Sequence, residues 1–115
     1  MTERMQEPTL LVLTALADKP RHGYAIMQEV RDLSAGQVNL RTGTLYGALD
    51  RLVRQGLITT CAQEIVKGRA RRIYALTPAG RDALAVEALR LRATLDAVRD
   101  RLAAPAPHTA VRTFA

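Results

Sequence analysis

The chain has few of the residues that build metal centres, disulfide scaffolds or catalytic sites. Its 115 residues include one cysteine, Cys61, one serine, Ser34, and two histidines, His22 and His108. A single cysteine excludes an internal disulfide and a thiolate metal site. No Ser–His–acid arrangement, glycine-rich phosphate loop or dinucleotide fingerprint can be assembled from these residues. The sequence therefore predicts a protein that is not an enzyme and that uses no metal or cofactor.

Long apolar runs and a secretion signal are also lacking. No run reaches the roughly 18 residues of a membrane span, and the start carries Glu3 and Glu7 instead of a basic-then-apolar leader. We therefore expect a cytoplasmic protein with no membrane partner. The composition, 48% hydrophobic and 24% charged, is that of a globular domain. The net charge of +6 favours a polyanionic partner, with nucleic acid ahead of a membrane surface.

Three helices are predicted in the first half of the chain. Residues 8–17 are apolar nearly all round and must be covered by other elements. Residues 21–33 form the second helix, which ends at Gly36 in a left-handed cap. The third helix begins near Thr42, a suitable N-cap, and ends at residues 55–56. It buries a stripe of Leu45, Ala48, Leu49 and Leu52.

A hairpin and a long helix are predicted to follow. Strand-like runs at 57–66 and 72–76 flank a basic tip at 67–71, and Tyr74 faces the core. Thr77 then caps a helix that has Pro78 in its first turn. This order predicts a mainly α protein with a small β-hairpin, a winged helix-turn-helix. We assign residues 1–77 to the DNA-binding domain, 78–103 to a C-terminal dimerisation helix and 104–115 to a flexible tail.

Two stretches of the sequence lack negative charge. From Ile65 to Arg81 there are five cations and no acid, and from Leu33 to Leu49 the only charged residue is Arg41. A solvated turn would explain the hairpin alone. Together with an amphipathic third helix that can enter the major groove, the pattern favours double-stranded DNA. The predicted DNA contacts are Arg41, Thr42, Thr44, Tyr46, Arg51, Arg54, Lys67, Arg69 and Arg71.

Several single residues have two interpretations. Thr42 is a plain cap or also bonds to phosphate or base edges. Tyr46 contacts the DNA or packs against the second helix. His22 and Tyr24, at the start of the second helix, are expected to be structural. Cys61 is an ordinary small side chain or, as the alternative, a thiol sensor.

The last predicted helix carries a heptad seam. Its apolar residues follow steps of four and three. Packing against its own domain would need only a short strip, so pairing with a second copy across a two-fold axis is favoured. The predicted dimerisation residues are Leu84, Ala88, Leu91, Leu95, Val98 and Leu102.

Four motifs stand in a fixed order between residues 10 and 84. They are HGY at 22–24, GTLYGAL at 43–49, RL at 51–52 with GLI at 56–58, and GR at 68–69 with RIYALTPAG at 72–80. With this spacing the sequence resembles the PadR family of bacterial transcriptional regulators. The resemblance implies a homodimeric repressor, of the subgroup with one C-terminal helix, that responds to phenolic acids, drugs or other planar apolar molecules. The chain has no Trp, and its last predicted helix has no aromatic residue, which disfavours an aromatic-stacking drug site.

We therefore expect a homodimer that sets two third helices in successive major grooves, about 34 Å apart, over a pseudo-palindromic operator. A small apolar or phenolic effector would release the DNA by preferring another dimer geometry. Leu91, Leu95 and Val98 are candidates for lining its site. The alternatives are a winged-helix adaptor that binds proteins and a small-molecule-binding protein without operator recognition.

Overall fold

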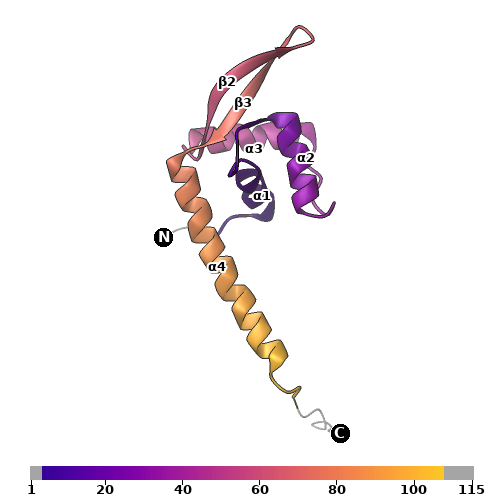
Figure 1. The fold of residues 1–115 in the computed structure, drawn as a ribbon, viewed down its shortest axis with the longest axis vertical. Coiled ribbons are helices and arrows are strands. Elements are labelled where there is room, and N and C mark those ends of the chain that lie inside the picture. The colour runs from indigo at the N-terminus through magenta and orange to yellow at the C-terminus, as the bar shows by residue number, and fades with distance from the viewer. Residues whose placement is uncertain (1–3, 108–115) are drawn as a thin grey trace.

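The fold is a body of three helices from which a β-hairpin and a long helix extend in opposite directions (Figure 1). The computed structural model describes residues 4–107, and the predicted tail from His108 onward lies outside them. The elements are α1 (Glu7–Ala15), β1 (Arg21–His22), α2 (Gly23–Leu33), α3 (Thr42–Arg54), β2 (Ile58–Val66), β3 (Arg69–Leu76) and α4 (Pro78–Ala103). The predicted winged helix-turn-helix with a long C-terminal helix is confirmed. Among residues 4–107, no helix combines the length and apolar character needed to cross a membrane.

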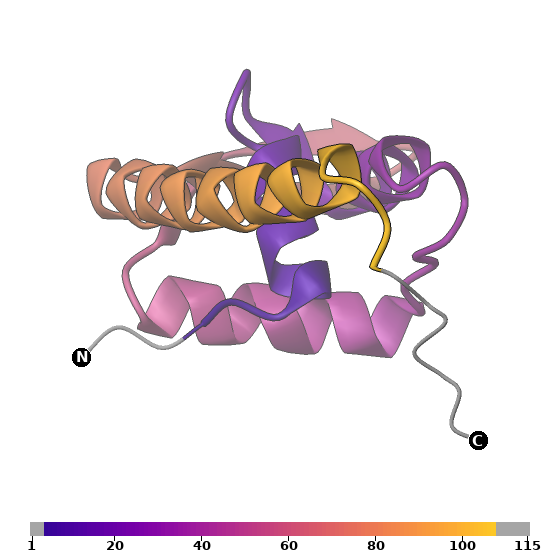
Figure 2. The same cartoon turned by 90° about the horizontal axis from the view of Figure 1, so that it is seen from below.

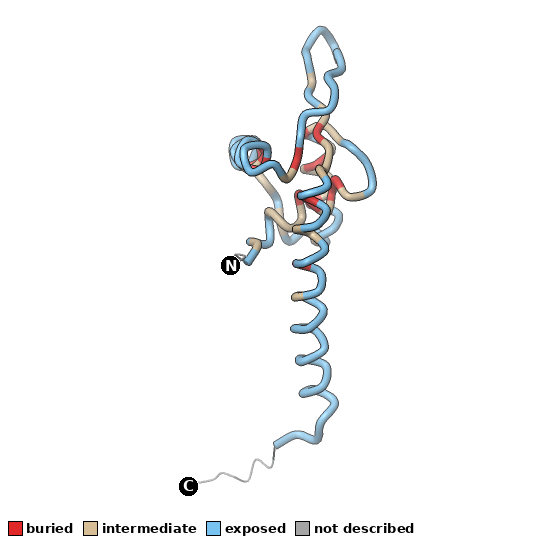
Figure 3. Tube along the Cα trace, turned by 90° about the vertical axis from the view of Figure 1, so that its left-hand side faces the viewer, coloured by how far each residue is buried: buried red, intermediate tan, exposed pale blue. Residues whose placement is uncertain are grey.

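The core fills the space between α1, α2, α3 and the base of the sheet. Seen from below, α1 lies between α4 and α3 (Figure 2), which explains why a helix that is apolar nearly all round is stable: neighbours cover it. Most buried residues lie in this body; in α4 only Gly80 and Glu87 are buried, and every residue from Leu91 to Ala103 is exposed (Figure 3). The buried hydrophobic residues are Val12, Leu13, Ala15, Leu16, Ile26, Val30, Leu45, Leu49, Leu52, Ile58 and Tyr74.

The sheet has three antiparallel strands in the order β1-β3-β2. In β1, Arg21 pairs with Tyr74 and His22 with Ile73. The prediction that residues 21–22 open the second helix is therefore wrong. His22 has an extended backbone and is the N-cap of α2, so the helix begins only at Gly23. Tyr74 is buried, as predicted.

The hairpin formed by β2 and β3, hereafter the wing, turns more tightly than expected. Pairing continues to Val66 and Arg69, which leaves a two-residue loop, Lys67-Gly68. Both loop residues have positive φ, 52° and 78°, the conformation of the tight turns that match strand twist. The predicted five-residue tip is wrong, because Arg69 and Arg71 belong to β3. They therefore extend from a regular strand.

Of the two predicted N-caps, Thr77 is confirmed and Thr42 is wrong. Thr77 Oγ1 accepts the N–H of Gly80 at 3.0 Å, and Pro78 occupies the first turn of α4, as predicted. In α3, however, the N-cap is Arg41, whose extended backbone lets its carbonyl accept the N–H of Leu45 at 2.8 Å. Thr42 is already helical and makes no capping bond. The prediction of Thr42 as a cap is therefore wrong.

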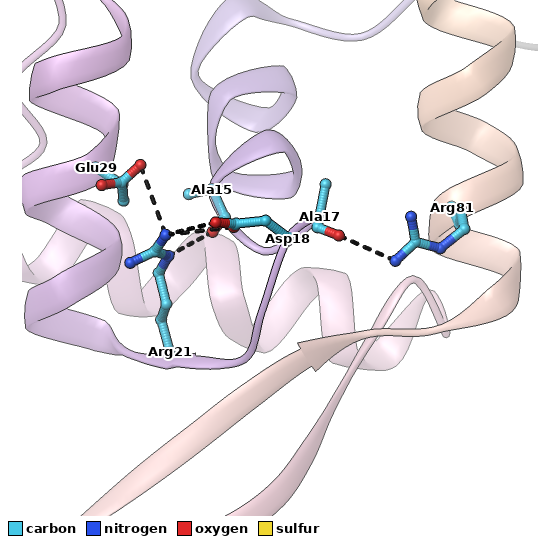
Figure 4. A network of polar contacts seen from close by, with 6 residues as sticks. All are labelled: Ala15, Ala17, Asp18, Arg21, Glu29 and Arg81. Carbon is cyan, nitrogen blue, oxygen red and sulfur yellow. Dashed lines mark hydrogen bonds and ion pairs between the residues drawn. The ribbon is translucent and has the colours of Figure 1, made fainter.

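Two arginines tie the other elements to the end of α1 (Figure 4). Arg21 Nε donates to the Ala15 carbonyl at 2.7 Å, and its Nη2 lies 3.1 Å from Asp18 Oδ2. Arg81, in the first turn of α4, donates to the Ala17 carbonyl at 3.1 Å. The first bond satisfies a carbonyl that the end of α1 leaves unpaired, and the second satisfies a carbonyl in the turn just after the C-cap, Leu16. The start of α4 is thereby held in place relative to the three-helix body.

Candidate nucleic-acid interface

A surface cleft of about 680 Å³ lies between Tyr46 of α3 and the wing. We call it the wing cleft. Its remaining lining residues are Val66, Lys67, Arg69, Ala70, Arg71, Arg72 and Tyr74. Of the four cations, Lys67, Arg69 and Arg71 were predicted DNA contacts. Arg72 was not, because strand alternation groups it with the core-facing Tyr74; its strand extends past the core, where the side chain is exposed.

Helix α3 presents three different surfaces. It buries Leu45, Leu49 and Leu52. Tyr46, 41% exposed, lies on the flank that faces the wing cleft. Thr44 and Arg51 lie on the opposite flank, where Arg51 Nη2 donates to Thr9 Oγ1 of α1 at 3.0 Å. Of the predicted contacts, the structure therefore brings Tyr46 to the wing cations and does not bring Thr44 or Arg51 there.

The remaining predicted contacts on α3 lie at its two ends. Arg41 and Thr42 are exposed at the N-terminus, and Arg54 is exposed in the last turn. At 3.6 residues per turn, the side turned directly away from the buried stripe carries Gly43, Gly47 and Arg54. A β-carbon added at either glycine would meet no other atom within 4 Å. This side of α3 is consequently smooth and open to a close approach.

Tyr46 was predicted either to contact DNA or to pack against the second helix, and its position in the structure is compatible with both. Its ring rests against Gly23 at the start of α2: a β-carbon on that glycine would stand 2.7 Å from Tyr46 Cζ. The ring therefore packs against α2, and its other side stays exposed to the wing cleft. Tyr24, expected to pack, is instead exposed, and its hydroxyl accepts a hydrogen bond from Gln28 Nε2 at 3.0 Å. That prediction is wrong.

His22 connects α2 to the wing, a role that sequence reasoning missed. Its Nδ1 accepts the N–H of Ala25 at 3.1 Å, and its Nε2 lies 3.1 Å from Arg71 Nη1. Arg71 Nη1 also lies 3.9 Å from Glu64 Oε1 on β2. Burial of the ring and then the Arg71 charge lower the pKa of His22 from 6.5, and Glu64 opposes them. No sequence signal marked this contact, because it depends on β1 pairing beside β3.

The predicted dimerisation seam lies bare along α4. Leu84 packs against the core, but exposure rises from 39% at Leu91 to 80% at Leu102. The face of α4 that meets the body is centred instead on Gly80 and Glu87, which are buried. The seam therefore lies beside the helix face used within the chain, and from Leu91 to Leu102 no other part of residues 4–107 buries it.

A second hollow, of about 510 Å³, lies on the other side of α3, between the N-terminal segment and the start of α4. Apolar walls come from Met5, Val12, Leu40 and Leu57, and two guanidinium groups come from Arg4 and Arg51. Among residues 4–107, no group of three or more His, Cys, Asp or Glu side chains could hold a metal ion.

Comparison with known proteins finds curated relatives that match part of the chain. The chain is 45% identical to the transcriptional regulator Rv3488 of Mycobacterium tuberculosis over 75 residues, which are 65% of this chain and 66% of that protein. The chain spans between 23% and 66% of the lengths of the curated relatives it matches.

Solved structures agree on the fold. A PadR family transcription regulator from Clostridium difficile R20291 superposes with a TM-score of 0.72 and 27% identity, over 84% of this chain and 99% of that one. Bacillus subtilis PadR, solved in complex with operator DNA, has a TM-score of 0.61 and 20% identity, over 90% of this chain and 53% of that one. At that identity the second likeness concerns the fold alone.

The family assignment rests on most of the winged domain. Residues 12–86 match the PadR-like family of transcriptional regulators. The match begins in α1 and ends in the first third of α4, so it includes α3, the wing and His22. The prediction that the protein is not an enzyme is confirmed by this match, since the family consists of transcriptional regulators. The chain belongs to the PadR-like family of transcriptional regulators.

Proposed function

We propose that the protein is a homodimeric repressor that binds a pseudo-palindromic operator in double-stranded DNA and leaves it when a small apolar or phenolic ligand binds. The observation that carries this proposal is the wing cleft, which four cations of the wing line together with Tyr46 of α3. Family membership supports DNA as the partner. The solved complex of Bacillus subtilis PadR with operator DNA, which shares the fold, is consistent with it.

The charges of the wing fit the phosphate backbone. Lys67, Arg69, Arg71 and Arg72 lie within six residues of one hairpin, and Glu64, the nearby acid, is 3.9 Å from Arg71. Phosphate contacts supply most of the affinity of DNA-binding proteins and are independent of sequence. Base choice would then fall to the N-terminal half of α3, whose smooth outer side permits entry into the major groove.

The exposed seam of α4 supports the homodimer. Along α4, an apolar line is left exposed by the rest of residues 4–107; it consists of Leu91, Leu95, Val98 and Leu102. A heptad seam of this kind is buried when two helices pair. Pairing would also fix the distance between two copies of α3, which a two-fold symmetric operator requires.

The second hollow is our candidate for the effector site. Its apolar walls and the Arg4 and Arg51 guanidinium groups would suit a small aromatic acid. It adjoins both α3 and the start of α4, so a ligand there can favour a different angle between the two. Leu91, Leu95 and Val98, the candidates from sequence, are assigned to the dimer seam instead.

A salt titration tests the DNA interface. Fluorescence anisotropy with a random-sequence 30-base-pair duplex should give a slope of log K against log salt of about −7, if each subunit neutralises about four phosphates at roughly 0.9 each. Arg69→Ala with Arg71→Ala should make the slope shallower by about 3.6 per dimer. Arg101→Ala, which removes an exposed charge at the far end of α4, is the matched control and should change little.

The alternatives predict other results. An adaptor that binds proteins would show no salt-dependent binding to any duplex. A small-molecule-binding protein without operator recognition would show a ligand-induced rise in melting temperature and no DNA binding. Either result overturns the proposal. The release step is tested by measuring the melting temperature of the protein with a phenolic acid, first without DNA and then with the duplex bound.

A further inference from the structure

The ring of His22 has a fixed distribution of hydrogen-bonding groups. Its Nδ1 accepts the backbone N–H of Ala25, which caps α2, so Nδ1 carries a lone pair and no proton. A neutral imidazole holds one proton, and that proton must then be on Nε2. His22 therefore presents an N–H donor on the side that faces the wing.

The Nε2–H donor of His22 lies next to a second donor, the guanidinium group of Arg71. Nε2 lies 3.1 Å from Arg71 Nη1, and a guanidinium group has donors only. With Nε2 protonated, no hydrogen bond joins the two, so two N–H groups converge without an acceptor between them. Glu64 does not supply one, since its Oε1 is 3.9 Å from the same Arg71 nitrogen. Converging donors of this kind form a site for an anionic oxygen.

The pair lies where the proposed DNA would pass. Arg71 lines the wing cleft. Gly23, the residue after His22, is in contact with the ring of Tyr46, which lines the same cleft. Register explains the geometry: His22 stands opposite Ile73, and Arg71 is two residues before Ile73 on the same face of β3. The short strand β1 thus aligns the start of α2 with a cation of the wing.

We infer that His22 and Arg71 together bind one phosphate of the DNA backbone, whose oxygen accepts hydrogen bonds from His22 Nε2–H and from the Arg71 guanidinium. The inference rests on the proposed DNA-binding function and adds a contact from α2. His22 acts as a neutral donor, since protonation at Nδ1 would break the cap and place a second positive charge beside Arg71. Arg71 and Glu64 are the charged groups that face the ring from the wing.

Two substitutions distinguish the capping role of His22 Nδ1 from the proposed phosphate contact of His22 Nε2. In His22→Asn the amide oxygen can still cap α2, because Asn is a strong N-cap, but nothing reaches the position of Nε2. In His22→Gln the amide reaches toward Arg71 and the cap is lost. We expect His22→Asn to melt within a degree or two of the wild type and to bind the 30-base-pair duplex about tenfold more weakly. His22→Gln should melt lower and, while folded, retain more of the affinity.

Salt dependence and coupling give independent readouts. His22→Asn should leave the slope of log K against log salt unchanged, because a neutral ring displaces no counterion, whereas Arg71→Ala should reduce it by about 1.8 per dimer. The double variant should lose less affinity than the two single losses multiplied, since both partners hold the same phosphate. The ¹⁵N shifts of His22 in the wild-type protein should show the Nε2–H tautomer, and Nε2 should shift on adding duplex.

The outcomes separate this inference from the proposed function. If the wild type binds duplex DNA and His22→Asn binds equally well, the phosphate pair is overturned and the DNA-binding proposal stands. A proton on Nδ1 in the free protein would also overturn the pair, because Arg71 would then simply donate to His22. If the wild type binds no duplex, the proposed function fails first, and the inference fails with it.

Discussion

The phenol ring of Tyr46 in α3 lies directly over Gly23, the first residue of α2. Only a residue without a β-carbon leaves room for it, since an added β-carbon would stand 2.7 Å from Tyr46 Cζ. Gly23 is buried by this contact, and the opposite side of the ring faces the wing cleft. The glycine of the HGY motif and the tyrosine of the GTLYGAL motif are therefore the two partners of one contact.

Gly23→Ala should displace Tyr46 from the wing cleft. Overpacking of this kind costs about 1–3 kcal/mol of folding free energy, unless the ring swings outward. We expect weaker binding to duplex DNA, measured by anisotropy, together with a modest fall in melting temperature. In a Tyr46→Ala background the same substitution should cost little. An equal cost in both backgrounds would show that Tyr46 is not the residue that Gly23 accommodates.

Leu95→Glu should dissociate the proposed dimer, because it sets two carboxylates into an apolar seam. Sedimentation velocity should show a monomer, and DNA affinity should fall by more than tenfold because the two copies of α3 are no longer linked. Leu89→Glu is the matched control, since Leu89 is on the same helix, 73% exposed and outside the seam. If Leu95→Glu sediments like the wild type, the seam has been assigned wrongly.

Gly80→Ala should be strongly destabilising. A β-carbon there would overlap the carbonyl oxygen of Leu57 and stand 2.8 Å from Leu76 Cδ1, and a backbone carbonyl cannot move aside as a flexible side chain can. We expect a loss of about 2–4 kcal/mol, read from urea unfolding. Gly47→Ala is the counterpart within α3: it meets nothing within 4 Å and should raise stability by up to about 1 kcal/mol.

Acid should weaken the fold through His22. Burial of the ring, and then the Arg71 charge, lower the folded-state pKa from 6.5, so between the two values the unfolded chain binds more protons. The free energy of unfolding should therefore decline as the pH falls below about 6.5 and level off once the folded-state pKa is passed. The urea midpoints of wild type and His22→Asn should diverge over this range. Parallel pH profiles would contradict the assignment.

The features that follow from local chemistry were predicted well. Thr77 and Pro78 mark the start of α4 because a cap and a fixed φ act within one turn. Tyr74 is buried because its strand alternates with period two. The same alternation led to the omission of Arg72 from the predicted DNA contacts, because it groups Arg72 with the buried Tyr74. Alternation does not tell where along a strand the core ends and solvent begins.

The features that depend on distant contacts were missed. The strand β1 has only two residues, too few for a periodic signal, and exists because Arg21 and His22 meet β3 about fifty residues later. The contact between His22 and Arg71 follows from that pairing. Thr42 illustrates a different failure, since a good capping residue stood next to the true cap, and the backbone of Arg41 decided which position was used.

The central claim is that two copies of α3 and the wing read a symmetric site in duplex DNA. Selection of bound sequences from a random duplex library tests it most directly. The account predicts an inverted repeat whose half-site centres lie about 10–10.5 base pairs apart, one helical turn. Recovery of no enriched sequence, or of a single half-site without symmetry, would contradict it.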